Sequence, residues 1–187
     1  TFHTIPEPNE PGYETWLNDS ALYTGNAGVW APMSADIENG LVYLPVESAT
    51  GDQYGGDRHG DNLFANSLIA LDFRTGKMKW YFQLIHHDIW DMDIPTAPIL
   101  ADLPNGKKIV AQVTKQGFVY VFDRINGKPI WPINEIPVPQ TDVDGEWTAP
   151  TQPIPELPAP FERQGVTKED LIDYTPEIRR AVDDLLT

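Results

Sequence analysis

A hairpin-like segment occurs twice in this chain, at residues 67–80 and 117–131, and this repeat constrains the fold more than any other feature. Each copy contains an apolar run, an Asp, a turn with Gly, a Lys and then a Trp. Asp72 and Asp123 are 51 positions apart, and so are Trp80 and Trp131. A hairpin repeated about every 40 to 50 residues is typical of β-propeller blades. The alternative is two independent hairpins that share common turn chemistry.

Short apolar runs predict further strands at residues 40–45, 97–101 and 108–114. The last two lie between the copies of the repeat and would fill a four-stranded blade. With 18 Pro and 14 Gly in 187 residues, the chain is interrupted too often for a helical bundle. The sequence therefore predicts an all-β fold. Residues 47–62 are polar and contain several Gly, which favours a long loop that carries a functional site.

The chain changes character after the second repeat. We expect propeller blades over residues 1–133 and, within the same domain, a Pro-rich insertion and an amphipathic helix over residues 134–187. Pro has no backbone N–H and so cannot donate the hydrogen bonds that join β-strands. The Pro-rich part is therefore predicted to run extended over a surface, outside any sheet. Thr167 to Asp170 resembles a capping box, and Thr175 with Pro176 begins a second helix. That helix carries an apolar stripe expected to pack on the domain or on a partner: Ile178, Ala181, Val182, Leu185 and Leu186.

The net charge excludes one class of partner. Thirteen Lys and Arg against 28 Asp and Glu give −15, so the chain repels the phosphates of nucleic acids and anionic lipid surfaces. Cys is absent, which excludes disulfides and thiolate metal sites. No apolar run is long enough for a spanning helix. Since the sequence begins at Thr1 without an apolar leader, we interpret it as an excerpt of a longer protein.

Residues 86–93 contain two His and three Asp where the first repeat ends. Adjacent His side chains on a strand point to opposite faces, so a site in which His86 and His87 bind one metal is the weaker option. If the segment is extended, Asp91 and Asp93 face the same way and could share a hard cation. The alternative is that these Asp residues cap turns, as most loop Asp do.

Two further residues could serve a ligand. Lys115 lies at the connection between two strands of one blade, where it could be a fixed cationic donor to an electron-rich oxygen. Most Lys side chains are simply solvated. Trp30 lies among small residues that would let a flat partner approach, although packing in the core is an equal alternative.

Four motifs occur along the chain in this order: residues 29–34 (VWAPMS), 60–67 (GDNLFANS), 86–93 (HHDIWDMD) and 114–117 (TKQG). Together they resemble the pyrroloquinoline quinone (PQQ)-dependent dehydrogenases. Residues 137–140 (PVPQ), 150–153 (PTQP) and 167–171 (TKEDL) also resemble its membrane glucose dehydrogenase branch. The resemblance runs over nearly the whole chain.

The resemblance implies an eight-bladed propeller with Trp-docked blades, of which this chain supplies about three. It also implies PQQ and a divalent cation at the central channel. Asp91 matches the catalytic base and a carboxylate beside the metal, Lys115 matches the residue that hydrogen-bonds the quinone oxygens, and Trp30 matches the Trp that stacks on PQQ. Other parts of the site, including a Glu metal ligand, would lie outside this chain.

The chain differs from the family pattern at one position that would bind the metal. Ser48 stands where many relatives have an Asn whose amide oxygen binds the cation, and a hydroxyl is a poorer ligand. Glu47 or a water could compensate. Asp93 adds a carboxylate found in some relatives that use lanthanides, but the same Asp-Met-Asp is normal for the glucose branch, so the resemblance favours calcium or magnesium.

The resemblance implies a periplasmic enzyme, either free or anchored to the membrane through an N-terminal segment absent here. It would oxidise a sugar, polyol or alcohol by hydride transfer to PQQ and pass electrons to a quinone or cytochrome. We expect this chain to be incomplete and inactive without the rest of the propeller. A non-catalytic propeller that binds other proteins is the first alternative. A His/Asp metallohydrolase is the second, and it would require His86 or His87 to face the cation.

Overall fold

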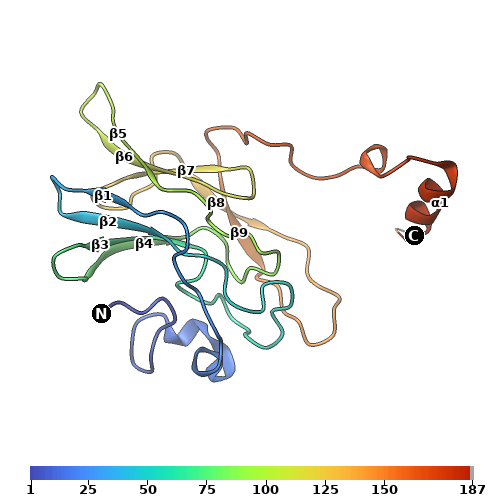
Figure 1. Ribbon diagram of the computed structural model, residues 1–187, viewed down its shortest axis with the longest axis horizontal. Coiled ribbons are helices and arrows are strands. Elements are labelled where there is room, and N and C mark those ends of the chain that lie inside the picture. The colour runs from blue at the N-terminus through green and yellow to red at the C-terminus, as the bar shows by residue number, and fades with distance from the viewer. Residues whose placement is uncertain (186–187) are drawn as a thin grey trace.

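The structure of the chain, a computed structural model, describes residues 1–185 and contains three separate antiparallel sheets (Figure 1). The first sheet has four strands in sequence order, the second has three and the third has two. Their bounds are β1 (Ser34–Asp36), β2 (Leu41–Pro45), β3 (Ser67–Asp72), β4 (Met78–Gln83), β5 (Ile99–Asp102), β6 (Lys108–Val113), β7 (Val119–Asp123), β8 (Ile133–Pro137) and β9 (Thr151–Pro155).

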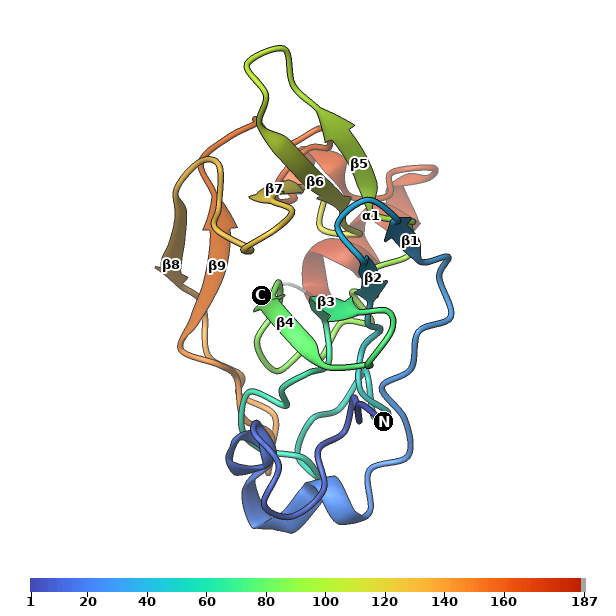
Figure 2. The ribbon, with the colours of Figure 1, turned by 90° about the vertical axis from the view of Figure 1, so that its left-hand side faces the viewer.

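The first two sheets have the meander order of propeller blades, with each strand beside its neighbour in the chain (Figure 2). Each predicted strand is present, as β2, β5 and β6. The all-β class is therefore confirmed. The sheets do not close into a ring, and each ends in an open edge strand.

The two copies of the repeat fold alike at their turns. Asp72 Oδ1 accepts hydrogen bonds from the backbone N–H groups of Arg74 and Thr75, at 3.0 Å each. Asp123 Oδ1 accepts the equivalent bonds from Ile125 (2.9 Å) and Asn126 (3.1 Å). The carboxylate of each copy thus holds its turn by satisfying backbone donors. The predicted repeat is confirmed as two equivalent turns.

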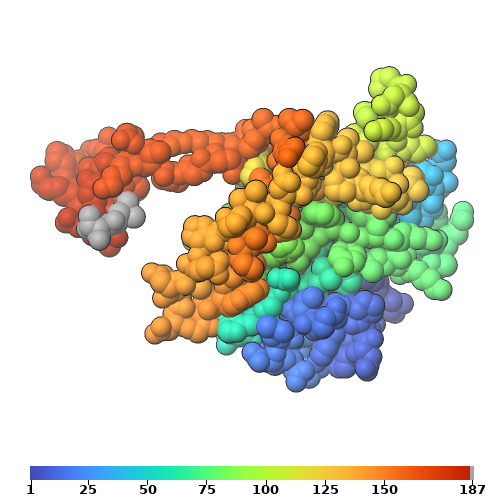
Figure 3. Space-filling view, turned by 180° about the vertical axis from the view of Figure 1, so that it is seen from behind, coloured from blue at the N-terminus to red at the C-terminus, as the bar shows by residue number. Residues whose placement is uncertain are grey.

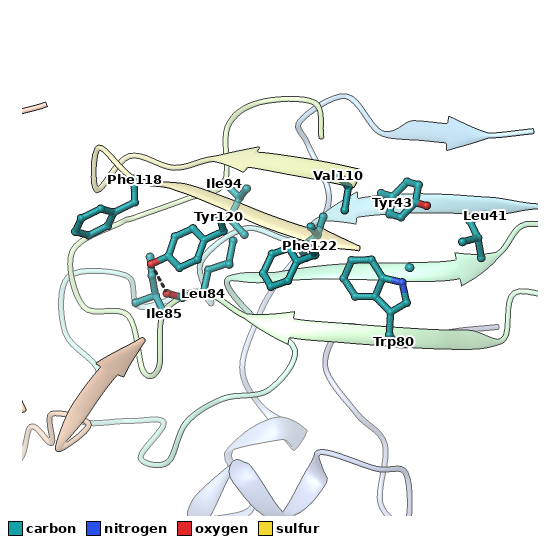
Figure 4. Packing of buried hydrophobic residues seen from close by; sticks show 12 residues of the cluster. Leu41, Tyr43, Trp80, Leu84, Ile85, Ile94, Val110, Phe118, Tyr120 and Phe122 are labelled. Carbon is teal, nitrogen blue, oxygen red and sulfur yellow. Dashed lines mark hydrogen bonds between the residues drawn. The ribbon is translucent and has the colours of Figure 1, made fainter. Parts of the chain in front are cut away.

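Trp80 joins the first two sheets. Its ring is buried against Phe122, with ring centroids 5.8 Å apart, and its Nε1 donates to the carbonyl of Arg124 at 3.1 Å. Figure 4 shows this ring within the main core, between strands of both sheets. The Trp of one blade therefore docks on the turn of the next, because Gly127 leaves room for the indole ring.

We expect Gly127→Ala to separate these blades. Gly127 has φ 72°, and an added Cβ would lie 2.6 Å from Trp80 Cδ2. The left-handed backbone costs about 1–2 kcal/mol for Ala, and overpacking against the ring adds about 1–3 kcal/mol. Gly76 is the matched control, since it has φ 69° in the equivalent turn and an added Cβ would have nothing within 4 Å. Thermal unfolding of the full-length protein should show a larger loss for Gly127→Ala than for Gly76→Ala, and equal losses would contradict Trp80 docking.

The second copy of the repeat differs at its outer strand. Where the first copy has β4, the second copy has no full strand among the described residues. It has an isolated bridge between Phe122 and Pro129 and a hydrogen bond from Ile130 N–H to the Val121 carbonyl. Pro129 has no N–H and so cannot extend a ladder there. Trp131, the counterpart of buried Trp80, is 38% exposed.

The expectation that the Pro-rich segment lies outside any sheet is wrong. Residues 133–137 (β8) pair with residues 151–155 (β9), and Pro137, Pro153 and Pro155 lie within these strands. A two-stranded sheet consists only of edges, so a Pro can direct its missing donor away from the partner strand. Ile133 and Ile154 pack against the main core, which holds the hairpin on the blades.

The helices are short and lie outside the sheets. They are the 3-10 helices η1 (Tyr13–Thr15), η2 (Leu17–Leu22) and η3 (Lys168–Asp170) and the α-helix α1 (Pro176–Leu185). The capping box at Thr167 and the start of α1 at Pro176 agree with the prediction. Within residues 1–185, no helix is both long and apolar enough to cross a lipid bilayer.

The apolar stripe was expected to pack on the domain or on a partner. Packing on the domain is wrong for the residues described, and packing on a partner stays a prediction. No residue of α1 is buried, and Leu185 is 84% exposed. Leu186 lies outside the described residues. Figure 3 shows the C-terminal segment extending away from the body formed by the sheets.

Candidate functional site

A cavity of about 310 Å³ is lined mainly by carboxylates and lies between the loop after β2 and the loop after β4. We call it the carboxylate cavity. Its acidic side chains are Glu47, Asp52, Asp91 and Asp93, and Ser48 also lines it. Four of the residues singled out in the sequence therefore line one space: Glu47, Ser48, Asp91 and Asp93.

A buried carboxylate shapes the loop that presents Asp91. Asp88 accepts hydrogen bonds from the backbone N–H groups of Trp90 (2.9 Å) and Met92 (2.6 Å), and from the side chain of Asn66 (3.1 Å). This turn places Asp91 in the left-handed region at φ 52°. Burial raises the pKa of Asp88, while the bonds from Trp90 and Met92 oppose that change. Capping of turns, the alternative considered for the whole cluster, is thus what Asp88 does.

Arg58 ties this loop to the other wall of the cavity. Its guanidinium is buried and donates to the backbone carbonyls of Thr50 (3.1 Å), Gly51 (2.9 Å) and Asp88 (2.5 Å). It also donates to the side chain of Asn62 at 2.7 Å. Burial lowers the pKa of Arg58, opposed by the nearby Asp88 carboxylate. Because one rigid cation satisfies carbonyls from both loops, the cavity walls are held together before any ligand binds.

Lys115 reaches the cavity from the turn between β6 and β7. Its Nζ donates to Asp91 at the backbone carbonyl (2.7 Å) and at Oδ2 (3.2 Å), and to Asp93 Oδ2 at 3.1 Å. Burial lowers the pKa of Lys115, but the hydrogen bonds to Asp93 and Asp91 outweigh it and the net shift is upward. Lys115 is therefore a fixed ammonium group. Within the described part of the chain, the other oxygen of Asp91, Oδ1, makes no hydrogen bond.

The donor set of the cavity suits a hard cation. Its polar groups are carboxylate and hydroxyl oxygens, the ligands that calcium and magnesium prefer. Asp93 Oδ1 is held by the backbone N–H of Ser48 at 3.0 Å, so the Ser48 backbone orients a carboxylate of the cavity. The buried Ser48 hydroxyl lies near the Asp88 carboxyl but falls short of a hydrogen bond to the described residues.

Glu47 connects the cavity to the segment that carries Trp30. Its Oε1 accepts hydrogen bonds from the backbone N–H of Gly28 at 2.7 Å and from the side chain of Asn26. Trp30 follows two residues later and is 57% exposed. Packing in the core, the alternative considered for this side chain, is therefore wrong.

The two His residues point away from the cavity. His87 is buried, where Nδ1 contacts the Gly60 carbonyl (2.8 Å) and the Asn62 side chain (3.0 Å). His86 lies on another face, with Nε2 3.1 Å from Glu135. Neither ring lines the carboxylate cavity. The geometry expected of a His/Asp metallohydrolase is absent among the described residues.

We expect His87 to make stability depend on pH. Burial, with the nearby Arg58 charge, lowers its pKa from 6.5 to about 4. Because the unfolded chain binds this proton at higher pH than the folded chain, stability is present above pH 6.5 and is lost as the pH falls towards 4. This group contributes about 3 kcal/mol at most over that range. Thermal unfolding of the full-length protein between pH 7 and pH 4 should be less pH-dependent in His87→Gln, and an unchanged dependence would contradict the assignment.

Sequence reasoning did not identify Asp52 or Arg58. Both lie in residues 47–62, the polar Gly-containing stretch expected to carry a site. The stretch was therefore recognisable, but the roles of its members were not. The hydrogen bonds of Arg58 depend on how two loops meet, which no local pattern shows.

The whole chain, residues 1–187, matches the family described as PQQ: glucose/ethanol/alcohol dehydrogenase, beta-propeller domain. It is 42% identical over 145 residues to the quinoprotein glucose dehydrogenase of Escherichia coli, covering 75% of this chain and 18% of that protein. It is also 35% identical over 176 residues to the quinate/shikimate dehydrogenase (quinone) of Acinetobacter baylyi, covering 91% of this chain and 22% of that protein.

Solved structures give the same result for the fold. A quinohemoprotein alcohol dehydrogenase from Pseudomonas putida superposes with a TM-score of 0.62 at 30% identity, over 83% of this chain and 25% of that one. The curated relatives are several times longer than this chain, which spans about a fifth of their length. The chain therefore belongs to the PQQ-dependent dehydrogenase family, as a part of its β-propeller domain.

Proposed function

We propose that this chain is the part of a PQQ-dependent dehydrogenase that oxidises a sugar, polyol or alcohol, and that Asp91 and Lys115 are its catalytic residues. Its relatives include glucose, quinate/shikimate, glycerol and alcohol dehydrogenases, all of which are named for the oxidation of a CH–OH group. The observation that carries the proposal is the contact of Lys115 with both Asp91 and Asp93 at the carboxylate cavity.

Oxidation of an alcohol removes a proton from the hydroxyl group and a hydride from the same carbon. A carboxylate is a weak base for an alcohol, so the proton transfer needs electrostatic assistance. Asp91 accepts the hydroxyl proton at Oδ1, while Lys115 holds Oδ2 and its ammonium group stabilises negative charge that develops nearby. PQQ, when bound, supplies the hydride acceptor.

Trp30 and the oxygen donors would hold the cofactor and its cation. The exposed face of Trp30 offers a stacking surface for a flat heterocycle. Asp91 and Asp93, with the Ser48 hydroxyl as a weaker ligand, would bind calcium or magnesium rather than a lanthanide.

We further propose a periplasmic enzyme that passes electrons to a quinone or a cytochrome and needs the rest of its propeller for activity. The test is to express the full-length protein, add PQQ with calcium or magnesium, and measure the reduction of an artificial dye by glucose, polyols, quinate and primary alcohols. We expect reduction only with PQQ. Reduction without PQQ, or none with any substrate, would favour the non-catalytic alternative or another cofactor.

A further inference from the structure

The turn that carries Lys115 is held from two sides. Residues 114–118 connect β6 to β7, and a hydrogen bond from the Gly117 N–H to the Thr114 carbonyl, at 3.1 Å, closes the turn. On one side, the ammonium group of Lys115 reaches two carboxylates in the loop after β4. On the other side, the turn contacts a segment that follows β9, residues 161–164. We call this segment the clamp.

Two hydrogen bonds join the clamp to the turn. The backbone N–H of Phe161 donates to the Gly117 carbonyl at 2.9 Å. Gln164 Nε2 donates to the Gln116 carbonyl, also at 2.9 Å. The same amide group donates to the Glu162 carbonyl at 3.2 Å, which fixes it over the turn. Carbonyls of a surface turn generally face water, so these two contacts restrain a backbone that would otherwise be free to move.

The clamp lies directly against Gly117. This residue has φ 82°, and an added Cβ would lie 2.8 Å from Glu162 Cβ and 3.1 Å from Gln164 Nε2. The turn at the other end of β6 gives a comparison, because Gly106 has φ 80° there and closes its turn with a backbone hydrogen bond at 2.9 Å. An added Cβ at Gly106 would have nothing within 4 Å. Of these two similar turns, therefore, the one between β6 and β7 is covered and the other is open.

The restraint acts where a lysine needs it. A lysine side chain is a flexible stem with four carbons, and the side chain of Lys115 is 36% exposed. Its Nζ donates to oxygens on the loop after β4, so a shift of the turn would move the ammonium group relative to Asp91. A misplacement of about 1 Å at a reacting group can lower a rate about 100-fold. Fixing the backbone of the turn therefore preserves the contact between the ammonium group and the Asp91 carboxylate.

We propose that the clamp positions Lys115 for the reaction, with Gln164 as a positioning residue that acts through the backbone of the turn. The inference rests on the proposed function, because it takes Lys115 to be a catalytic residue. Beyond the clamp, the chain extends away from the sheets (Figure 3). Residues 161–164 thus also fix the point at which the C-terminal segment leaves the body.

The first test follows the Lys115 amine without relying on turnover. In the PQQ-free, full-length protein, the rate at which acetic anhydride modifies Lys115 is measured by mass spectrometry. An ammonium group that donates to carboxylates is protected from acylation, so Gly117→Ala and Gln164→Ala should each increase this rate about fivefold. Gly106→Ala is the matched control and should keep the wild-type rate, since it places Ala on the same left-handed backbone without meeting another segment.

The second test is steady-state turnover with PQQ and calcium. We expect Gly117→Ala to lower kcat about tenfold and to leave the KM nearly unchanged, because the ammonium group acts on charge that develops during the reaction. Gly106→Ala should retain wild-type kcat. Adding Glu162→Gly to Gly117→Ala removes the Cβ that the new methyl group meets, so the double variant should recover part of the lost rate. Gln164→Ala changes only an exposed side chain, which keeps the inference testable if Gly117→Ala does not fold.

The outcomes distinguish the clamp from the proposed function. Equal acylation and equal kcat in Gly117→Ala, Gln164→Ala and Gly106→Ala would overturn the inference. Lower thermal stability of the clamp variants with wild-type acylation and kcat would also overturn it, because the clamp would then hold the fold without positioning Lys115. Faster acylation in the clamp variants, combined with wild-type turnover of Lys115→Ala, would support the clamp and overturn the catalytic role of Lys115.

Discussion

Asp91→Asn in the full-length protein should reduce turnover by about 10² to 10⁴-fold, the usual contribution of a general base. The amide has nearly the shape of the carboxylate but cannot accept the hydroxyl proton. Lys115 keeps its bonds to the Asp91 backbone carbonyl (2.7 Å) and to Asp93 (3.1 Å), so the cavity should retain its structure. The measurement is the steady-state rate of dye reduction with saturating substrate and PQQ.

Asp57→Asn is the control for this charge change. Asp57 lies in the loop after β2, which forms the other wall of the carboxylate cavity, but it does not line the cavity and its side chain is exposed. We expect wild-type turnover from Asp57→Asn. If Asp91→Asn also retained wild-type turnover, Asp91 would have no part in proton transfer.

Lys115→Ala should reduce kcat by about 10² to 10³-fold, as expected when one preorganised donor to a developing negative charge is removed. The turn should survive, because it is closed by a backbone hydrogen bond from Gly117 to Thr114 at 3.1 Å rather than by the ammonium group. The KM should change little, since Lys115 is proposed to act on charge that develops during the reaction.

Lys107→Ala is the matched control for this substitution. Lys107 and Lys115 flank the two ends of β6, so their turns lie at opposite ends of one strand. Lys107 is exposed. Equal losses in the two variants would show that a general effect of positive charge, rather than contact with Asp91, accounts for the rate.

The fold was predictable where local chemistry determines it. The Asp of each hairpin turn caps the same backbone donors in both copies, so the spacing of Asp72 and Asp123 marked two equivalent blades. Pairing of the Pro-rich strands was not predictable by the same reasoning. The pairing depends on whether each Pro directs its missing N–H away from the partner strand. The contacts of Ile133 and Ile154 with the main core determine this orientation, and that core is built from residues distant in sequence.

Most residues of the candidate site could be predicted from the sequence, but the backbone conformation that brings them together could not. Asp91 and Asp93 were expected to face the same way because the segment would be extended. They do line one cavity, but a turn held by Asp88 and a left-handed Asp91 bring them there. The family resemblance implied that Lys115, from the next blade, serves the same cofactor as Asp91, but neither it nor any local pattern predicted their direct contact.

The central claim is that Trp30, Asp91 and Lys115 serve one bound PQQ. The most direct measurement is the structure of the full-length protein with PQQ and calcium. The account predicts the PQQ ring on the face of Trp30, Lys115 Nζ within hydrogen-bonding distance of a PQQ oxygen, and the Asp91 carboxylate beside both. A PQQ molecule bound out of contact with all three side chains would contradict it.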